Sequence, residues 1–167
     1  MNPIQKIKDS PYYLRLKESV EYRYNKKRFI LFAAIFGGID AFWLLMFRSL
    51  VSNPEYEAYR ALICLEPALL YFPALLYFAY RWLEIFLCID SYIFREVLLD
   101  HPRVWGRGGV KFTVTFTDQH GKKLQRNTST MFSSGAEPRL VDYNNKKVLI
   151  GYNEKTKRVV VLKRLDG

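Results

Sequence analysis

Two long apolar stretches, residues 29–47 and 62–89, constrain this 167-residue chain more than any other feature of its sequence. A helix of about 20 apolar residues, rising ~1.5 Å per residue, spans the ~30 Å hydrocarbon core of a bilayer. Because lipid offers the backbone no hydrogen-bond partners, each stretch is expected to cross as a helix. We therefore predict a membrane α+β protein, in which a two-helix transmembrane hairpin precedes a small antiparallel β-barrel or sandwich-like domain.

Charge is segregated along the chain. Residues 1–28 carry a net charge of +5, residues 29–102 carry −4, and residues 103–167 carry +9. Lys26, Lys27 and Arg28 stand immediately before the first apolar stretch. Lysine and arginine next to a span are retained on the cytoplasmic side. The pattern predicts a multi-pass protein of a bacterial inner (plasma) membrane, with both termini in the cytoplasm.

These patterns predict three segments. Residues 1–28 form a basic juxtamembrane amphipathic segment, residues 29–102 the hairpin, and residues 103–167 a soluble β-domain. The second helix is expected to continue to about residue 99, because proline at position 102 disfavours helix in the residue before it.

The first segment opens with Ser10-Pro11, a combination typical of a helix start. An apolar stripe of Tyr13, Leu16, Val20 and Tyr24 follows, whereas Glu21 is expected on another face. Two placements stay open: the helix lies among lipid headgroups, or it extends the first span and packs on the β-domain.

Ionisable residues inside the apolar stretches are expected to pair, because a charge near the bilayer centre costs roughly 2.5–3.5 kcal/mol. With residues 29 and 89 at one depth, the hairpin register predicts the pairs Asp40–Arg81 and Arg48–Glu66. Glu84 shares a helix face with Arg81 by its spacing. In the alternative interpretation, Asp40, Arg81 and Glu84 line an ion or proton path, which two helices cannot enclose without oligomerising.

Small residues recur at every fourth position of the first stretch, at Ala33, Gly37 and Ala41. Such a ladder lets another helix approach closely. We expect it to be a helix-packing face, either within the hairpin or between copies of the chain.

The pattern of the last sixty residues predicts β-strands. Residues 110–117 alternate apolar and polar side chains without a break, which is typical of a half-buried strand. A turn at 118–121 leads to a polar strand, and residues 147–152 and 158–162 are expected to form a hairpin. Gly151, inside a strand, is expected to mark a bulge or tight bend.

Residues 110–165 resemble a family of uncharacterised bacterial membrane proteins that join two spanning helices to a small β-domain. The matching features are the strand 110–117, the turn 118–121, and Val148-Leu-Ile-Gly-Tyr-Asn153 leading to Val159-Val-Val161. Asn145 stands where the family has glycine, and Glu154 replaces its proline. The resemblance implies this architecture and no activity.

Enzyme signatures are absent from the sequence. It has no phosphate-binding glycine loop, no nucleophile elbow and no paired-cysteine or His-Glu-x-x-His metal motif. His101 and His120 are expected in solvated loops. We therefore predict a protein that is not an enzyme, with no catalytic residue, metal or cofactor.

Basic residues give the remaining indication of what the protein binds. Anionic lipid of the inner leaflet attracts such clusters, although lysines also keep a small β-domain soluble and its edges unpaired. Nucleic acid is an unlikely partner, because the aromatic residues of strand 110–117 are expected in the core. The predicted anionic-surface residues are Lys26, Lys27, Arg28, Lys122, Lys123, Lys146 and Lys147.

Together these patterns predict a non-enzymatic accessory, regulatory or immunity-type protein that binds a protein partner at the membrane. The alternative is an oligomeric transporter or channel subunit that uses the intramembrane charges.

Overall fold

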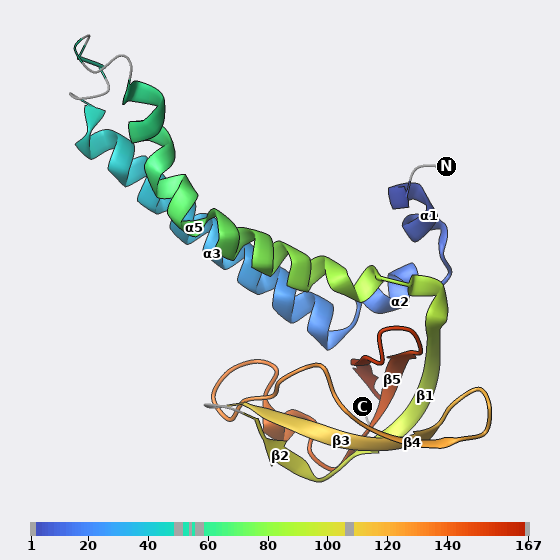
Figure 1. Cartoon of the computed structure of the whole chain (residues 1–167). Helices are drawn as coiled ribbons and strands as arrows, with labels where there is room; N and C mark the ends of the chain where they lie inside the picture. Colours follow the sequence, from blue (N-terminus) through green and yellow to red (C-terminus); the bar gives the residue numbers. More distant parts are fainter. Residues whose placement is uncertain (1–2, 49–51, 54, 56–58, 106–108, 166–167) are drawn as a thin grey trace. The chain divides into compact units, whose positions relative to one another are not determined.

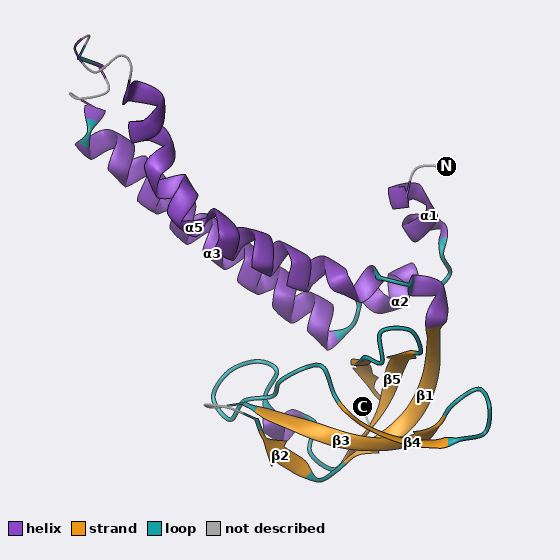
Figure 2. Cartoon of the chain, in the orientation of Figure 1, coloured by secondary structure: helices purple, strands orange, loops and turns teal. Residues whose placement is uncertain are grey.

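The structure is a computed structural model, which describes residues 3–48, 52–53, 55, 59–105 and 109–165. The chain divides into two compact units. The first, here called the β unit, comprises Met1–Tyr24 and Leu83–Gly167, and the second, the helical hairpin, comprises Asn25–Trp82. Figures 1 and 2 show the helices and strands that make up these units.

Two antiparallel helices form the hairpin. Helix α3 spans Val20–Met46, so that its first turns belong to the β unit, and helix α5 spans Arg60–Leu83. They lie side by side in Figure 1 and contact each other through stacked aromatic rings. The ring centroids lie 5.4 Å apart for Phe29–Trp82 and 4.2 Å apart for Phe32–Phe78.

This register differs from the predicted one. Phe29 faces residue 82 and not residue 89, a shift of seven residues, or about two helical turns. The shift arises because α5 ends at Leu83, well before the end of the apolar stretch. Among the described residues, one helix, α3, is long and apolar enough to cross a membrane. Part of the predicted second span, residues 62–68, has side chains that lie outside the described ones.

The expected extension of the second helix to about residue 99 is wrong. After α5 come two short 3-10 helices, η2 (Glu84–Phe86) and η3 (Ile89–Ser91), separated by Cys88 at a φ of 53°. The chain then enters strand β1, Tyr92–Leu99, which pairs with β5 along its whole length. The apolar run that resembles helix is a strand because β5 supplies a complete hydrogen-bonding partner.

The β unit contains two three-stranded antiparallel sheets, and they do not close into a barrel. One sheet has the order β1-β5-β6, with β5 at Lys146–Asn153 and β6 at Val159–Arg164. The other has the order β2-β3-β4, with β2 at Pro102–Val104, β3 at Val110–Thr117 and β4 at Lys123–Asn127. Strand β3 coincides with the predicted strand.

Both sheets contribute to one hydrophobic core. Phe112, Phe132 and Val148 are fully buried there, and Phe112 meets Phe132 edge to face at 5.0 Å. Gly151 lies at a close approach: an added Cβ would be 3.2 Å from side-chain atoms of Tyr92 and Val160. The register shift between β5 and β6 falls beside it, at residues 149–150, which confirms the predicted irregularity.

The N-terminal segment joins this core. Helices α1 (Pro3–Asp9) and α2 (Tyr13–Lys17) precede α3. Leu16 is fully buried, and Val20 belongs to the core cluster of the strands. Of the two placements open from the sequence, these contacts agree with packing on the β-domain.

The adjacent leucines of β1 provide a matched test of this fold. Leu99 is fully buried, whereas Leu98 is 50% exposed. Leu99→Ala is expected to lower the free energy of unfolding of the β unit by about 2–5 kcal/mol, because it leaves a cavity in the core. Leu98→Ala should stay within about 1 kcal/mol of the parent protein. Urea unfolding of the full chain in detergent measures both, and equal losses at the two positions would contradict strand β1.

Candidate functional site

A buried ion cluster lies at the centre of the β unit. The guanidinium of Arg158 is 2.8 Å from a carboxylate oxygen of Glu21 and 2.7 Å from one of Glu84. Only 17%, 4% and 8% of these three side chains is exposed, in that order. Burying an unpaired carboxylate is expensive, and the arginine between the two acids offsets this cost for both.

Three distant parts of the sequence supply this cluster. Glu21 lies in the first turn of α3, Glu84 begins η2 directly after α5, and Arg158 immediately precedes β6. Burial of the guanidinium opposes its charged form, but the neighbouring carboxylates outweigh this and raise the pKa of Arg158. An arginine that is always charged cannot exchange protons in catalysis. The cluster therefore joins α3, η2 and the residue before β6 through two ion pairs.

Tyr92 and Asn153 complete the polar network around the turn that follows α5. The Tyr92 hydroxyl donates to the carbonyl of Ile85 at 3.0 Å, and burial raises the pKa of this phenol. The Asn153 amide nitrogen donates to the carbonyls of Leu87 and Cys88, both at 3.0 Å. Residues of β1 and β5 thus hold the segment 85–88 by its backbone.

A polar cleft of about 250 Å³ opens between two turns of the β unit. The β3–β4 turn is fixed by Asp118, whose carboxylate accepts the amides of His120 and Lys122 at 2.9 Å. The β5–β6 turn is fixed by Asn153, whose side-chain oxygen accepts the amides at 155 and 156. The cleft is lined by Asp118, His120, Lys122, Leu124, Arg126, Tyr152, Glu154 and Lys157.

The charge and size of this cleft limit what it can bind. Lys122, Arg126 and Lys157 outnumber the carboxylates of Asp118 and Glu154. Pockets for small organic ligands are usually larger and mostly apolar. The cleft therefore suits a charged side chain or chain terminus of another protein better than a cofactor. In the described part of the chain, no three metal-ligating side chains converge.

The predicted intramembrane charges have other partners in the structure. Asp40 accepts a hydrogen bond from the hydroxyl of Tyr71. The side chain of Asn25 donates to the carbonyl of Arg81 at 3.1 Å, which places Arg81 near the start of α3. Asp40 is fifteen residues further along α3, about 22 Å, so the structure does not bring Asp40 and Arg81 together.

Glu84 differs from its predicted setting, whereas the predicted pair of Arg48 with Glu66 stays a prediction. Glu84 lies beyond the end of α5 and pairs with Arg158 in the β unit. Arg48 is exposed at the far end of α3, and the side chain of Glu66, its predicted partner, lies outside the described residues.

The small-residue ladder does not form the contact within the hairpin. A Cβ added at Gly37 would meet nothing within 4 Å, and Ala41 is exposed. The rings of Phe29, Phe32 and Phe36 make the contact with α5 instead. Ala33 is half-buried on the same helix.

The predicted anionic-surface residues lie mostly in solvent. Those exposed are Lys26, Lys27, Arg28, Lys122, Lys123 and Lys147, and Lys146 is half-buried. The guanidinium of Arg28 also lies over the ring of Phe78, 5.1 Å from its centroid. Lys122 alone among the seven lines the cleft.

Sequence reasoning missed Glu21, Arg158 and Asn153. Glu21 stands beside an apolar stripe in the sequence, and nothing in its spacing distinguishes a buried carboxylate from a solvated one. Arg158 stands in a run of turn cations. Asn153, at the end of an apolar strand and before a turn, carries a usable signal, because asparagine there commonly accepts backbone amides.

Comparisons with known proteins add no functional assignment. No family model, no curated protein and no solved structure matches the chain.

Arg158→Met tests the ion cluster. It should lower the free energy of unfolding by about 3–5 kcal/mol, because two buried carboxylates lose their counter-ion. Arg139→Met is the matched control, since Arg139 pairs with Asp142 at the surface and contributes about 0–1 kcal/mol. Adding Glu21→Gln and Glu84→Gln to Arg158→Met should recover most of the loss.

Proposed function

We propose that this protein is a membrane-anchored, non-enzymatic accessory, regulatory or immunity-type protein. The hairpin crosses a bacterial inner membrane, both termini lie in the cytoplasm, and the β unit binds a protein partner there. The observation that carries the proposal is the apolar surface of the hairpin, together with the charged cleft of the β unit.

The hairpin exposes large apolar side chains along both helices. Soluble monomers rarely expose contiguous apolar patches larger than a few hundred Å². Lipid is the solvent that accommodates such a surface, and the cations at residues 26–28 favour a cytoplasmic start. The exposed side chains are Ile30, Leu31, Ile35, Ile39, Phe42, Leu44, Leu45 and Met46 on α3 and Leu69, Leu70, Phe72, Leu76, Tyr77 and Tyr80 on α5.

The cleft supports a binding function over a catalytic one. It offers cations and carboxylates on two rigid turns, with the buried ring of Tyr152 packed on Phe116 at 4.9 Å beneath them. It presents neither a nucleophile activated by a base nor a metal site, which are the usual starting points for chemistry. Charged groups in such an arrangement give specificity for a complementary protein surface. A channel role has less support, because Asp40 is hydrogen-bonded to Tyr71 of the facing helix.

Charge reversal in the cleft tests the partner interaction. Lys122→Glu with Lys157→Glu should abolish crosslinking of the full-length protein to a discrete heteropartner in native membranes, because the cleft loses two of its cations. Lys155→Glu with Lys163→Glu makes the same change in net charge at exposed residues that do not line the cleft.

The control pair should leave the crosslinked complex unchanged. Equal loss in both variants would indicate a general charge effect and contradict the cleft as the partner site. A ladder of homo-oligomers with no heteropartner would favour the channel alternative.

Membrane anchoring has its own test. The protein should remain in the membrane pellet after an alkaline carbonate wash and enter solution only with detergent. Recovery of the parent chain as a monomer in the soluble fraction, without detergent, would contradict the anchoring.

A further inference from the structure

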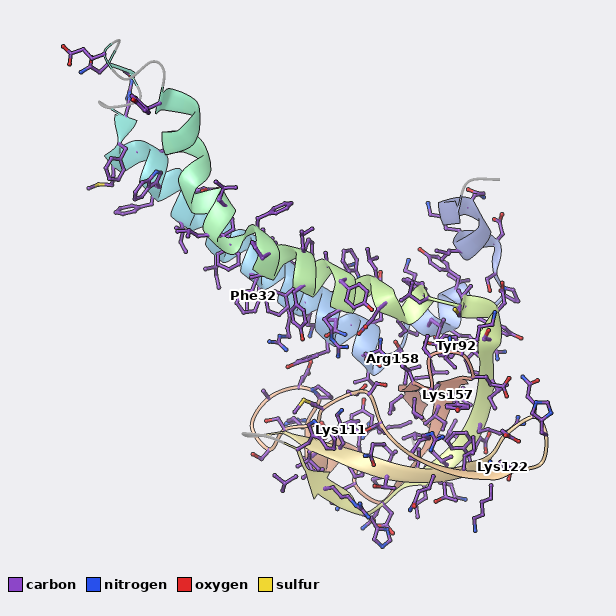
Figure 3. All side chains as sticks on the ribbon, in the orientation of Figure 1. Phe32, Tyr92, Lys111, Lys122, Lys157 and Arg158 are labelled. Carbon is purple, nitrogen blue, oxygen red and sulfur yellow. The ribbon has the colours of Figure 1, made fainter. Side chains whose placement is uncertain are left out.

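An exposed apolar patch lies at the end of β3 that is remote from the cleft. Val104, Trp105 and Met131 are 81%, 51% and 38% exposed, respectively. Figure 3 shows Lys111 at this end of β3 and Lys122, which lines the cleft, at the other. Trp105, Lys111 and Met131, together with Arg103, are called the Trp105 patch; Val104 pairs with Val110 on the opposite face of the sheet.

Local contacts order the patch. The Trp105 amide donates to the Gly109 carbonyl at 2.7 Å. A Cβ added at Gly109 would lie 3.4 Å from the Trp105 carbonyl oxygen and would collide with the terminal methyl of Met131. The backbone of Trp105 and the side chain of Met131 therefore both lie against Gly109.

Cations accompany this apolar surface. The ammonium of Lys111 lies over the indole of Trp105, 4.5 Å from the ring centroid. Arg103 is directly opposite Lys111 in the β2–β3 ladder, so both side chains lie on one face of the sheet. Between Asp100 and Asp118 the sequence has three Lys/Arg and no acidic residue.

We propose that the Trp105 patch docks on the anionic headgroup region of the bilayer that holds the hairpin. Tryptophan is enriched at the membrane–water interface, where its ring lies among headgroups. Lysine and arginine beside it are attracted to anionic lipid.

The charge and connectivity of the β unit favour the same partner. The unit carries 20 Lys/Arg against 12 Asp/Glu. Its link to α5 is direct, through η2, so a membrane-embedded hairpin keeps the patch at a high effective concentration near lipid. The inference rests on the proposed anchoring, and it leaves the cleft at the other end of β3 open to a partner.

Single-tryptophan variants of the full chain test the docking. The Trp105 reporter carries Trp43→Phe and Trp82→Phe, and the Trp43 reporter carries Trp82→Phe and Trp105→Phe. Each is reconstituted in vesicles of phosphatidylcholine alone or mixed with phosphatidylglycerol, with brominated lipid as quencher. Acrylamide measures exposure to water.

The Trp43 reporter should be quenched by brominated lipid in both vesicle types, because it lies in the apolar part of α3. The Trp105 reporter should lose most of its acrylamide quenching and become quenched by brominated lipid only in the anionic vesicles. High salt should reverse this change. Arg103→Gln and Lys111→Gln should each weaken docking roughly fivefold, the scale of one interfacial cation, whereas the exposed control Arg139→Gln should not.

The two tryptophan reporters distinguish a failure of the docking from a failure of the membrane anchoring. A Trp105 reporter that stays open to acrylamide in anionic vesicles, while Trp43 is quenched by lipid, overturns the docking and leaves the anchoring intact. A Trp43 reporter that brominated lipid does not quench overturns both. Equal burial of Trp105 in neutral and anionic vesicles overturns the recognition of anionic headgroups.

Discussion

The β unit depends on a guanidinium placed between two buried carboxylates. Removing ions from water costs several kcal/mol for each, and Arg158 offsets this cost by contacting both Glu21 and Glu84. Apolar packing of similar volume would stabilise the same position with less demand on geometry. The ions add specificity, because only one relative placement of α3, η2 and β6 brings the three charged side chains together.

That specificity bears on where the helices begin and end. Glu21 lies in the first turn of α3, and Glu84 is the first residue after α5. The same hairpin loop that supplies Arg158 supplies Asn153, whose amide holds the carbonyls at 87 and 88. The change from α5 to strand β1 is thus set by polar contacts from β5 and β6, and not by a helix-breaking residue at that point. This explains why an apolar stretch ending at residue 89 contains a helix that ends at 83.

The sequence predicts the local, periodic features of this protein well. The alternation at 110–117 identifies β3 to the residue, and the 147–162 hairpin appears as β5 and β6 with small extensions. Residues 92–99 have no comparable local signal, since an apolar run that follows a long helix predicts a continuation of that helix. Their strand state comes from pairing with β5, more than fifty residues later. The hairpin register was likewise set by where α5 ends, which tertiary contacts decide.

The same contrast between local sequence signals and long-range contacts holds for the candidate site. The sequence predicts Lys122 as a basic surface residue, yet its neighbours in the cleft, Tyr152 and Lys157, come from another hairpin. Arg158 and Glu21 are 137 residues apart, and charge alone does not distinguish a buried ion from a solvated one. The Trp105 patch was not anticipated either, because its exposure follows from the β2–β3 ladder.

The separation between Glu21 and Arg158 has a consequence for biogenesis. During synthesis the first acid emerges long before its counter-ion, and the second waits for more than seventy further residues. Glu21 must therefore remain hydrated while both apolar helices are made, and Glu84 must remain hydrated while the strands that follow it are made. Burial of the N-terminal segment can be completed only after the last hairpin has been translated. In the proposed topology, the cytoplasm-facing β unit therefore completes its folding after the helices have entered the membrane.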